Sequence, residues 1–223
     1  ILLGLVFGLA MLPQMWVQQV IRRHAAPRGD LPGTGSEIAR SLLDRMGLAH
    51  VKVEMTKEGD HYDPMEKVVR LLPEHFAKSS LSAVVIAAHE VGHAMQDATG
   101  YAPLIARTAI AKRAKRLETI GFAVLLLSPL VMLILKAPHV LIIELIGGLL
   151  LIGITVVMHA VTLPVEFDAS FKRALPLLGE ARILGEKDMP AARQILRAAA
   201  LTYVAAAAMS LLNIARWLRV LRI

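Results

Sequence analysis

The sequence has no cysteine, few aromatic residues and fewer acidic than basic side chains. Without cysteine, neither a disulfide framework nor a thiolate metal site can form, so any metal must be held by histidine and carboxylate groups. Aromatic residues make up only 4% of the 223 residues, and no basic patch contains interleaved aromatics, so we expect no nucleic-acid partner. The formal net charge of +7 is sufficiently explained by contact with an anionic lipid leaflet.

Apolar residues are in excess, at 56% of the chain against a usual value of about 45–50%. They concentrate in blocks at 1–21, 119–135, 140–163 and 198–215, which carry almost no charge. A membrane core about 30 Å thick is crossed by about 20 mostly apolar residues in a helix, so these blocks predict four transmembrane helices. The first block could instead be a cleaved signal peptide, but its length favours an anchor. Because the chain starts at Ile1 rather than Met, we expect that residues precede it.

Lysine and arginine are distributed unevenly between the segments that connect these blocks. Fifteen of the 25 lie between Arg22 and Arg116, and six more between Lys172 and Arg197. Basic segments near membrane spans stay on the cytoplasmic side, so both polar segments should be cytoplasmic. The expected division is a transmembrane helix at 1–21, a cytoplasmic zinc-peptidase domain at 22–116, a transmembrane hairpin at 117–163, a cytoplasmic helical segment at 164–197, and a last transmembrane helix with a basic tail at 198–223.

Local signals predict the elements of the first polar segment. Thr34-x-x-Glu37 matches a capping box at the start of a helix over 37–46. Alternation over 51–55 and the run 67–72 predict two strands, and 60–64 is typical of a turn. A long helix is expected over 82–98.

That long helix carries His89-Glu90-Val91-Gly92-His93. Histidines four residues apart lie on one helix face, so both can bind the same Zn²⁺. Glu90 can then accept a proton from the attacking water and pass it to the leaving amine. The alternative is a chance pair of histidines on a surface helix. The apolar residues just before the motif favour a buried helix, where unpaired His and Glu would be costly, and Gly92 and Ala94 would leave room beside the metal.

A catalytic zinc site takes three protein ligands and keeps one position open. We expect Glu166 to be the third ligand, because the predicted topology returns it to the same side of the membrane as His89. An ordinary interfacial carboxylate is the alternative interpretation of Glu166. Asp168 competes as a ligand, but two residues further along a helix it would face elsewhere, so we expect it to have a supporting role.

Several longer motifs carry a resemblance to a known family. They are His-Glu-Val-Gly-His-Ala-Met-Gln at 89–96, His-Tyr-Asp-Pro at 61–64, Leu-Pro-Val-Glu-Phe-Asp-Ala-Ser at 163–170 and Ala-Leu-Thr-Tyr-Val-Ala-Ala-Ala at 200–207. Over nearly the whole chain the sequence resembles the YugP-like family of bacterial membrane zinc metallopeptidases. The resemblance implies a neutral zinc metallopeptidase in the bacterial inner membrane with its site facing the cytoplasm.

The resemblance also implies a wider likeness to gluzincins such as the HtpX and CAAX prenyl proteases. Those use Glu-x-x-Ala-Asp for the third ligand, and here Ser170 replaces the final Asp. By analogy, the strand at 67–72 would be the sheet edge that holds an extended substrate.

Tyr203 is the expected catalytic helper that stabilises the oxyanion, with His61 or Tyr62 as alternatives. Arg107 and Arg173 could pair with Asp168 or with a substrate carboxylate.

The fold class expected is therefore a mainly α membrane protein, with about four transmembrane helices and a small α+β cytoplasmic metallopeptidase domain. The expected function is a membrane-embedded zinc endopeptidase that acts on proteins or peptides and has the lipid bilayer as a partner. One rival is a non-catalytic membrane scaffold with a structural zinc ion. Another is an intramembrane protease of the site-2 type, although Ser79, Ser80, Gln96 and Asp97 bracket the zinc helix too closely for a span of about 20 residues.

Overall fold

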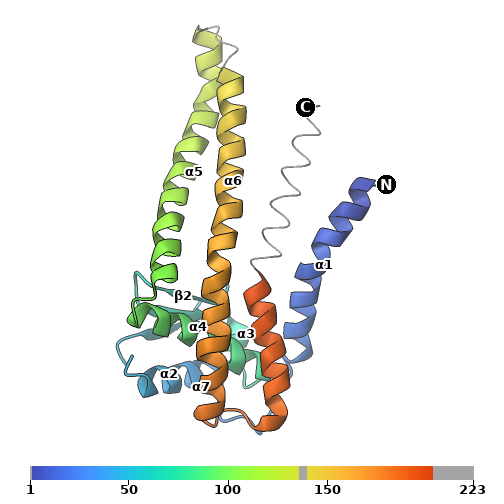
Figure 1. Cartoon of the computed structure of the whole chain (residues 1–223), viewed down its shortest axis with the longest axis vertical. Helices are drawn as coiled ribbons and strands as arrows, with labels where there is room; N and C mark the ends of the chain where they lie inside the picture. Colours follow the sequence, from blue (N-terminus) through green and yellow to red (C-terminus); the bar gives the residue numbers. More distant parts are fainter. Residues whose placement is uncertain (1, 136–139, 203–223) are drawn as a thin grey trace.

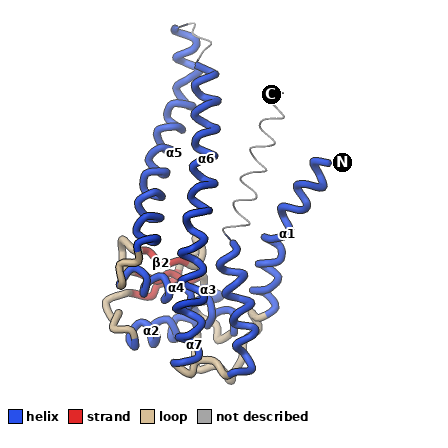
Figure 2. Tube along the Cα trace, viewed as in Figure 1, coloured by secondary structure: helices blue, strands red, loops and turns tan. Residues whose placement is uncertain are grey.

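The computed structural model describes residues 2–135 and 140–202. Two long antiparallel helices, α5 (Ala102–Leu135) and α6 (Val140–Phe167), pack side by side and extend away from a base of shorter elements (Figure 1). The base contains one small sheet, which lies at the foot of this helix pair (Figure 2). Helix α1 (Leu2–Arg23) contacts the base at its C-terminal end. There the Ser82 backbone N–H donates to His24 O, and the Ser82 hydroxyl donates to Ile21 O.

Within the described residues, no helix is both long enough and apolar enough to cross a membrane. The mainly helical class with a small sheet is found, but the prediction of about four transmembrane helices is wrong. The predicted multi-pass location in a bacterial inner membrane, with a site facing the cytoplasm, is contradicted with it. That prediction rested on runs without charge. In the structure, Pro13 lies inside α1, and the run at 119–135 is only the second half of α5, whose first half carries a basic cluster. The predicted helix at 198–223 lies mostly outside the described residues.

The predicted capping box is confirmed at the start of α2 (Gly35–Arg45). The Glu37 carboxylate accepts from Thr34 N at 2.8 Å, and Thr34 Oγ1 accepts from Glu37 N at 3.4 Å. These two bonds satisfy backbone donors that a helix start leaves unpaired. The cap thereby fixes the start of α2, whose buried face packs against α4.

Replacing Thr34 with alanine should lower the free energy of unfolding by about 1 kcal/mol, because the hydroxyl acceptor of the cap is lost. Urea unfolding followed by circular dichroism measures this change. Thr34→Ser retains the hydroxyl and serves as the control, with stability close to that of the unaltered chain. Equal losses in both variants would show that the hydroxyl is not what stabilises this helix start.

The sheet contains β1 (Lys52–Met55), β2 (His61–Asp63) and β3 (Val68–Leu71) in the order β1-β3-β2. Strand β3 pairs in parallel with β1 and antiparallel with β2. The expectation that the strand at 67–72 forms a substrate-binding edge is therefore wrong, since β3 is the central strand. The segment predicted as a turn at 60–64 contains the edge strand β2, which is too short to give a recognisable alternation.

Helix α4 (Leu81–Ala98) is the centre of the base, and all residues from 81 to 94 are buried. Ser80 caps its first turn by accepting from Ala83 N at 3.2 Å. Gly100 follows its end in the left-handed region, with φ of 63°, a conformation that favours glycine. The surroundings of α4 include α2, the sheet and α3 (Pro73–Phe76). This helix therefore presents its side chains to protein on almost every side.

Helix α6 continues without a break into a π-helical segment, η1 (Asp168–Ala174), and then into α7 (Leu175–Glu180). The chain turns through η2 (Glu186–Asp188) and is helical again over 189–202. Segment η1 packs directly on α4, so closely that a Cβ at Gly92 would lie 2.6 Å from Ala169 O. Gly92 thus accommodates this backbone contact, whereas the sequence suggested that it leaves room beside a metal.

Candidate metal centre

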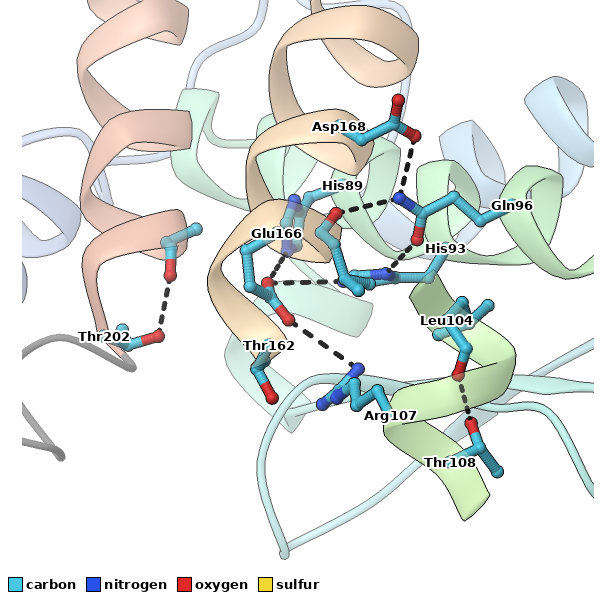
Figure 3. A network of polar contacts seen from close by, with 12 residues as sticks. His89, His93, Gln96, Leu104, Arg107, Thr108, Thr162, Glu166, Asp168 and Thr202 are labelled. Atoms are coloured by element: carbon cyan, nitrogen blue, oxygen red, sulfur yellow. Dashed lines mark hydrogen bonds and ion pairs between the residues drawn. The ribbon is translucent and has the colours of Figure 1, made fainter. Parts of the chain in front are cut away.

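Three predicted ligands come together where α4 meets the end of α6. The Glu166 Oε2 atom lies 3.1 Å from His89 Nε2 and 3.4 Å from His93 Nε2 (Figure 3). One ligand atom from each of the three residues falls within 4.8 Å of the others. All three side chains are buried, with Glu166 only 2% exposed. The four-residue spacing on α4 places both rings on the face that Glu166 approaches.

The second ring nitrogens of both histidines also contact side chains. His89 Nδ1 lies 3.0 Å from Ser170 Oγ, and His93 Nδ1 lies 3.0 Å from Gln96 Oε1. Ser170 follows Glu166 by four residues, so the two side chains contact opposite nitrogens of the same His89 ring. These contacts orient the rings so that both Nε2 atoms face the carboxylate, as the partners of metal-binding histidines do.

The Glu166 carboxylate is held in its ionised form. Burial opposes ionisation, but the adjacent His93 and His89 side chains outweigh it and hold the pKa of Glu166 well below its usual range. Its Oε1 atom is buried without a hydrogen-bond partner among the described residues, and Arg107 Nη1 lies 3.7 Å away. A buried carboxylate and two imidazoles with converging atoms are a donor set that suits Zn²⁺, so these residues fit the metal.

Glu90 lies beside this group and is 5% exposed. Burial raises the pKa of the Glu90 carboxyl to about 8. The electrostatic influence of His89 opposes this rise, and that of Glu166 reinforces it. Glu90 also lines a cavity of about 200 Å³. The other residues described around this cavity are Ile21, Asp60, His61, Tyr62, Ile86, His89, His93, Arg107, Glu166, Ala199 and Thr202. The candidate base therefore faces the same space as the candidate ligands.

The residues considered for stabilising an oxyanion have different placements. Tyr203 lies outside the described residues. Tyr62 lines the cavity, but its hydroxyl donates to Asp97 Oδ2 at 2.6 Å, so its single hydrogen is already engaged. His61 also lines the cavity and donates from Nδ1 to Gly59 O at 2.8 Å. A carbonyl oxygen only accepts, so in the neutral ring His61 Nε2 carries the lone pair.

Asp168 is near the three candidate ligands but has other partners. It accepts from Arg173 Nε at 2.8 Å and from Gln96 Nε2 at 2.9 Å. Arg107 and Arg173 are thus divided between the two carboxylates, with Arg107 beside Glu166 and Arg173 beside Asp168. The π-helical geometry of η1 begins at Asp168, directly after the ligand-bearing turn.

Comparison with known proteins gives one family. The profile of the family described as "Putative neutral zinc metallopeptidase" matches residues 1–222. The chain belongs to this family. It is also 35% identical over 217 residues to the "Putative membrane protease YugP" of Bacillus subtilis (strain 168), covering 96% of this chain and 92% of that protein. No solved structure matches the chain.

In this member of the neutral zinc metallopeptidase family, two residues that contact the candidate histidine ligands were not predicted from the sequence. Gln96 follows His93 by three residues and so shares its helix face, while Ser170 shares a face with Glu166. Both spacings could have indicated neighbours of a ligand. What no spacing could provide was the docking of η1 on α4, which brings Asp168 to Gln96 and Ser170 to His89.

Proposed function

We propose that the protein is a zinc-dependent endopeptidase in which His89, His93 and Glu166 hold the metal and Glu90 is the general base and then the general acid. The observation that carries this proposal is the convergence of three donor atoms within 4.8 Å, beside a buried carboxyl group that faces a cavity. Membership of the neutral zinc metallopeptidase family supports the same reaction class.

The chemistry divides between the metal and Glu90. A zinc ion held by His89, His93 and Glu166 would supply Lewis-acid activation of water and of the peptide carbonyl. Glu90 takes the proton of the attacking water on its carboxylate, holds it in the buried site, and delivers it to the leaving nitrogen. A pKa raised to about 8 lies near neutral pH, so both protonation states of Glu90 are accessible during one reaction cycle. A nearby cation would favour the carboxylate and so the base form at the start of the cycle.

The proposed substrate is an extended protein or peptide segment. A cavity of about 200 Å³ is smaller than most sites for drug-sized ligands, which measure about 300–1,000 Å³, and has room for little more than a side chain. Strand β2 is an edge of the sheet and contributes His61 and Tyr62 to the cavity wall. A substrate strand paired along β2 would place its backbone next to Glu90, with affinity coming from main-chain hydrogen bonds.

The rival function is a non-catalytic scaffold with a structural zinc ion. Structural zinc sites are closed by four protein ligands. Among the described residues, the cluster that could hold a metal contains three, and Asp168 is engaged by Arg173 and Gln96. Three candidate ligands rather than four favour catalysis over a structural role.

Metal removal tests the proposed function. The purified chain should contain about one zinc per molecule, as zincins with one His-Glu-x-x-His site do, and should cleave an unfolded protein such as reduced casein. Chelation should abolish cleavage, and added zinc should restore it. Zinc content is measured by atomic absorption and cleavage by the release of peptide amines.

A matched pair of histidine variants controls for general effects of substitution. His93→Ala should lose both zinc and cleavage, whereas His50→Ala, at an exposed loop position, should retain both. One zinc per chain without cleavage of any unfolded protein would support the scaffold instead. Cleavage that survives complete removal of metal would overturn the zinc-dependent mechanism.

A further inference from the structure

Gln96 is a completely buried amide on the last turns of α4, with 0% of its surface exposed. Its side chain makes three polar contacts with other described residues (Figure 3). The Oε1 atom lies 3.0 Å from His93 Nδ1, while Nε2 donates to Val165 O at 2.8 Å and to Asp168 Oδ2 at 2.9 Å. One side chain of the zinc helix thus joins a candidate ligand to the backbone and side chains at the end of α6.

The chemistry of these partners fixes which way the amide points. Val165 O is a carbonyl and can only accept a hydrogen bond. Asp168 Oδ2 already accepts from Arg173 Nε, so it faces the amide as an acceptor as well. The amide nitrogen must therefore face both of them, and the amide oxygen must face His93. The opposite orientation would bring oxygen against two oxygens inside a buried site.

The orientation of Gln96 in turn fixes the tautomer of His93. An amide oxygen only accepts, so the hydrogen between it and His93 must be on Nδ1. A neutral imidazole carries a single N–H, so Nε2 is left with its lone pair. That atom is the one directed at Glu166, 3.4 Å from Oε2, and a metal ion between the two would take the place of the hydrogen that the ionised carboxylate otherwise requires. His93 is therefore held in the form that can bind a metal through Nε2.

Arg173 completes this chain of contacts. Its Nε donates to Asp168 Oδ2 at 2.8 Å, and its guanidinium lies over the Tyr101 ring at 5.6 Å from the centroid. The same Asp168 oxygen, Oδ2, thus accepts from both Arg173 and Gln96. Asp168 is therefore an acceptor, as the orientation of Gln96 requires.

The tautomer of His89 is less strictly determined by its Nδ1 partner than that of His93. Its Nδ1 faces the Ser170 hydroxyl, which can donate or accept, so this contact is compatible with either tautomer. Ser170 Oγ also lies 3.4 Å from Leu196 O, a long contact. The His93 side of the site is thus the more strictly ordered of the two.

We propose that Gln96 is a positioning residue for zinc, and that Arg173 and Asp168 act through it to keep the His93 Nε2 lone pair directed into the site. This inference rests on the proposed zinc site, because it assigns a role to neighbours of a ligand. It also gives Asp168 a function other than ligation, although it lies only two residues from Glu166.

The test compares two substitutions that change the contacts of the amide in different ways. Gln96→Met has a similar size but offers neither an acceptor to His93 nor a donor to Asp168 and Val165, so its zinc affinity should fall. Gln96→Glu retains an acceptor for His93 but places a carboxylate oxygen against Asp168 Oδ2 and Val165 O, so zinc affinity should fall by about 10–100-fold, as is usual when the partner of a metal-binding histidine is altered. Gln19→Glu makes the same chemical change at an exposed position of α1 and should leave affinity unchanged.

Two measurements on the full chain separate positioning from a general effect on folding. Zinc affinity is measured by competition with a chromophoric chelator, and long-range ¹H–¹⁵N NMR on the zinc-loaded protein identifies which ring nitrogen of His93 carries the hydrogen. Wild type should show the Nδ1–H form. The NMR measurement on wild type requires no variant and stays decisive if Gln96→Glu fails to fold.

Three outcomes have distinct meanings. An Nε2–H form of His93 in the zinc-loaded wild type, or a Gln96→Met variant that binds zinc as tightly as wild type, would overturn the role of Gln96. Zinc binding that depends on Gln96 in a protein that cleaves no peptide would support that role and contradict only the proposed peptidase activity. Absence of zinc binding by wild type would overturn both.

Discussion

Glu90→Gln should abolish peptide cleavage, with a fall in kcat/KM of about 10²–10⁴-fold, and should leave zinc bound. Glutamine has nearly the same shape as glutamate but cannot take up the proton of the attacking water. The three proposed ligands are His89, His93 and Glu166, so the metal loses none of them. A neutral amide is also less costly to bury than a charge, so this variant should fold. Cleavage assays and zinc analysis on the same preparation measure both effects.

The matched control is Glu180→Gln, at an exposed position at the end of α7. It makes the same chemical change away from the cavity and should retain full activity. Cleavage by Glu90→Gln at a rate close to that of wild type would show that another group is the base. Loss of zinc together with activity would instead place Glu90 among the metal ligands.

The parts of the fold that were predictable from the sequence are those set by local chemistry. The capping box of Thr34 and Glu37 satisfies donors within one helical turn, and the helix predicted over 82–98 agrees with α4, Leu81–Ala98, to within one residue. The spacing of His89 and His93 determines that both rings lie on one face wherever the helix packs. None of these inferences needs a distant partner.

The parts that were missed depend on packing between distant segments. Strand β2 has only three residues and becomes a strand because β3 offers it a partner. The contact of Gln96 with Asp168 exists because η1 docks on α4. The predicted number of membrane helices was wrong, since within the described part of the chain no helix is long and apolar enough to cross a membrane.

Gly92→Ala should destabilise the protein and weaken zinc binding together. A Cβ at this position would lie 2.6 Å from Ala169 O, closer than real Cβ atoms come to other atoms, and the obstacle is backbone. Alanine favours helix over glycine by about 1 kcal/mol, but overpacking a core typically costs about 1–3 kcal/mol, and here no side chain can move aside. Because Ala169 follows Glu166 by three residues, pushing η1 away from α4 also draws the third proposed ligand away from His89.

Gly179→Ala is the control, and its expected effect has the opposite sign. Its Cβ would lie 3.7 Å from Met189 Cε, an ordinary contact, so only the helix preference of about 1 kcal/mol remains and unfolding should require more urea. Urea unfolding and zinc competition on both variants test the comparison. Increased stability in both would contradict the close contact of α4 with η1. The zinc motif itself accepts any residue at the position of Gly92, so the need for glycine there arises from the neighbouring helix that brings Glu166 to the site.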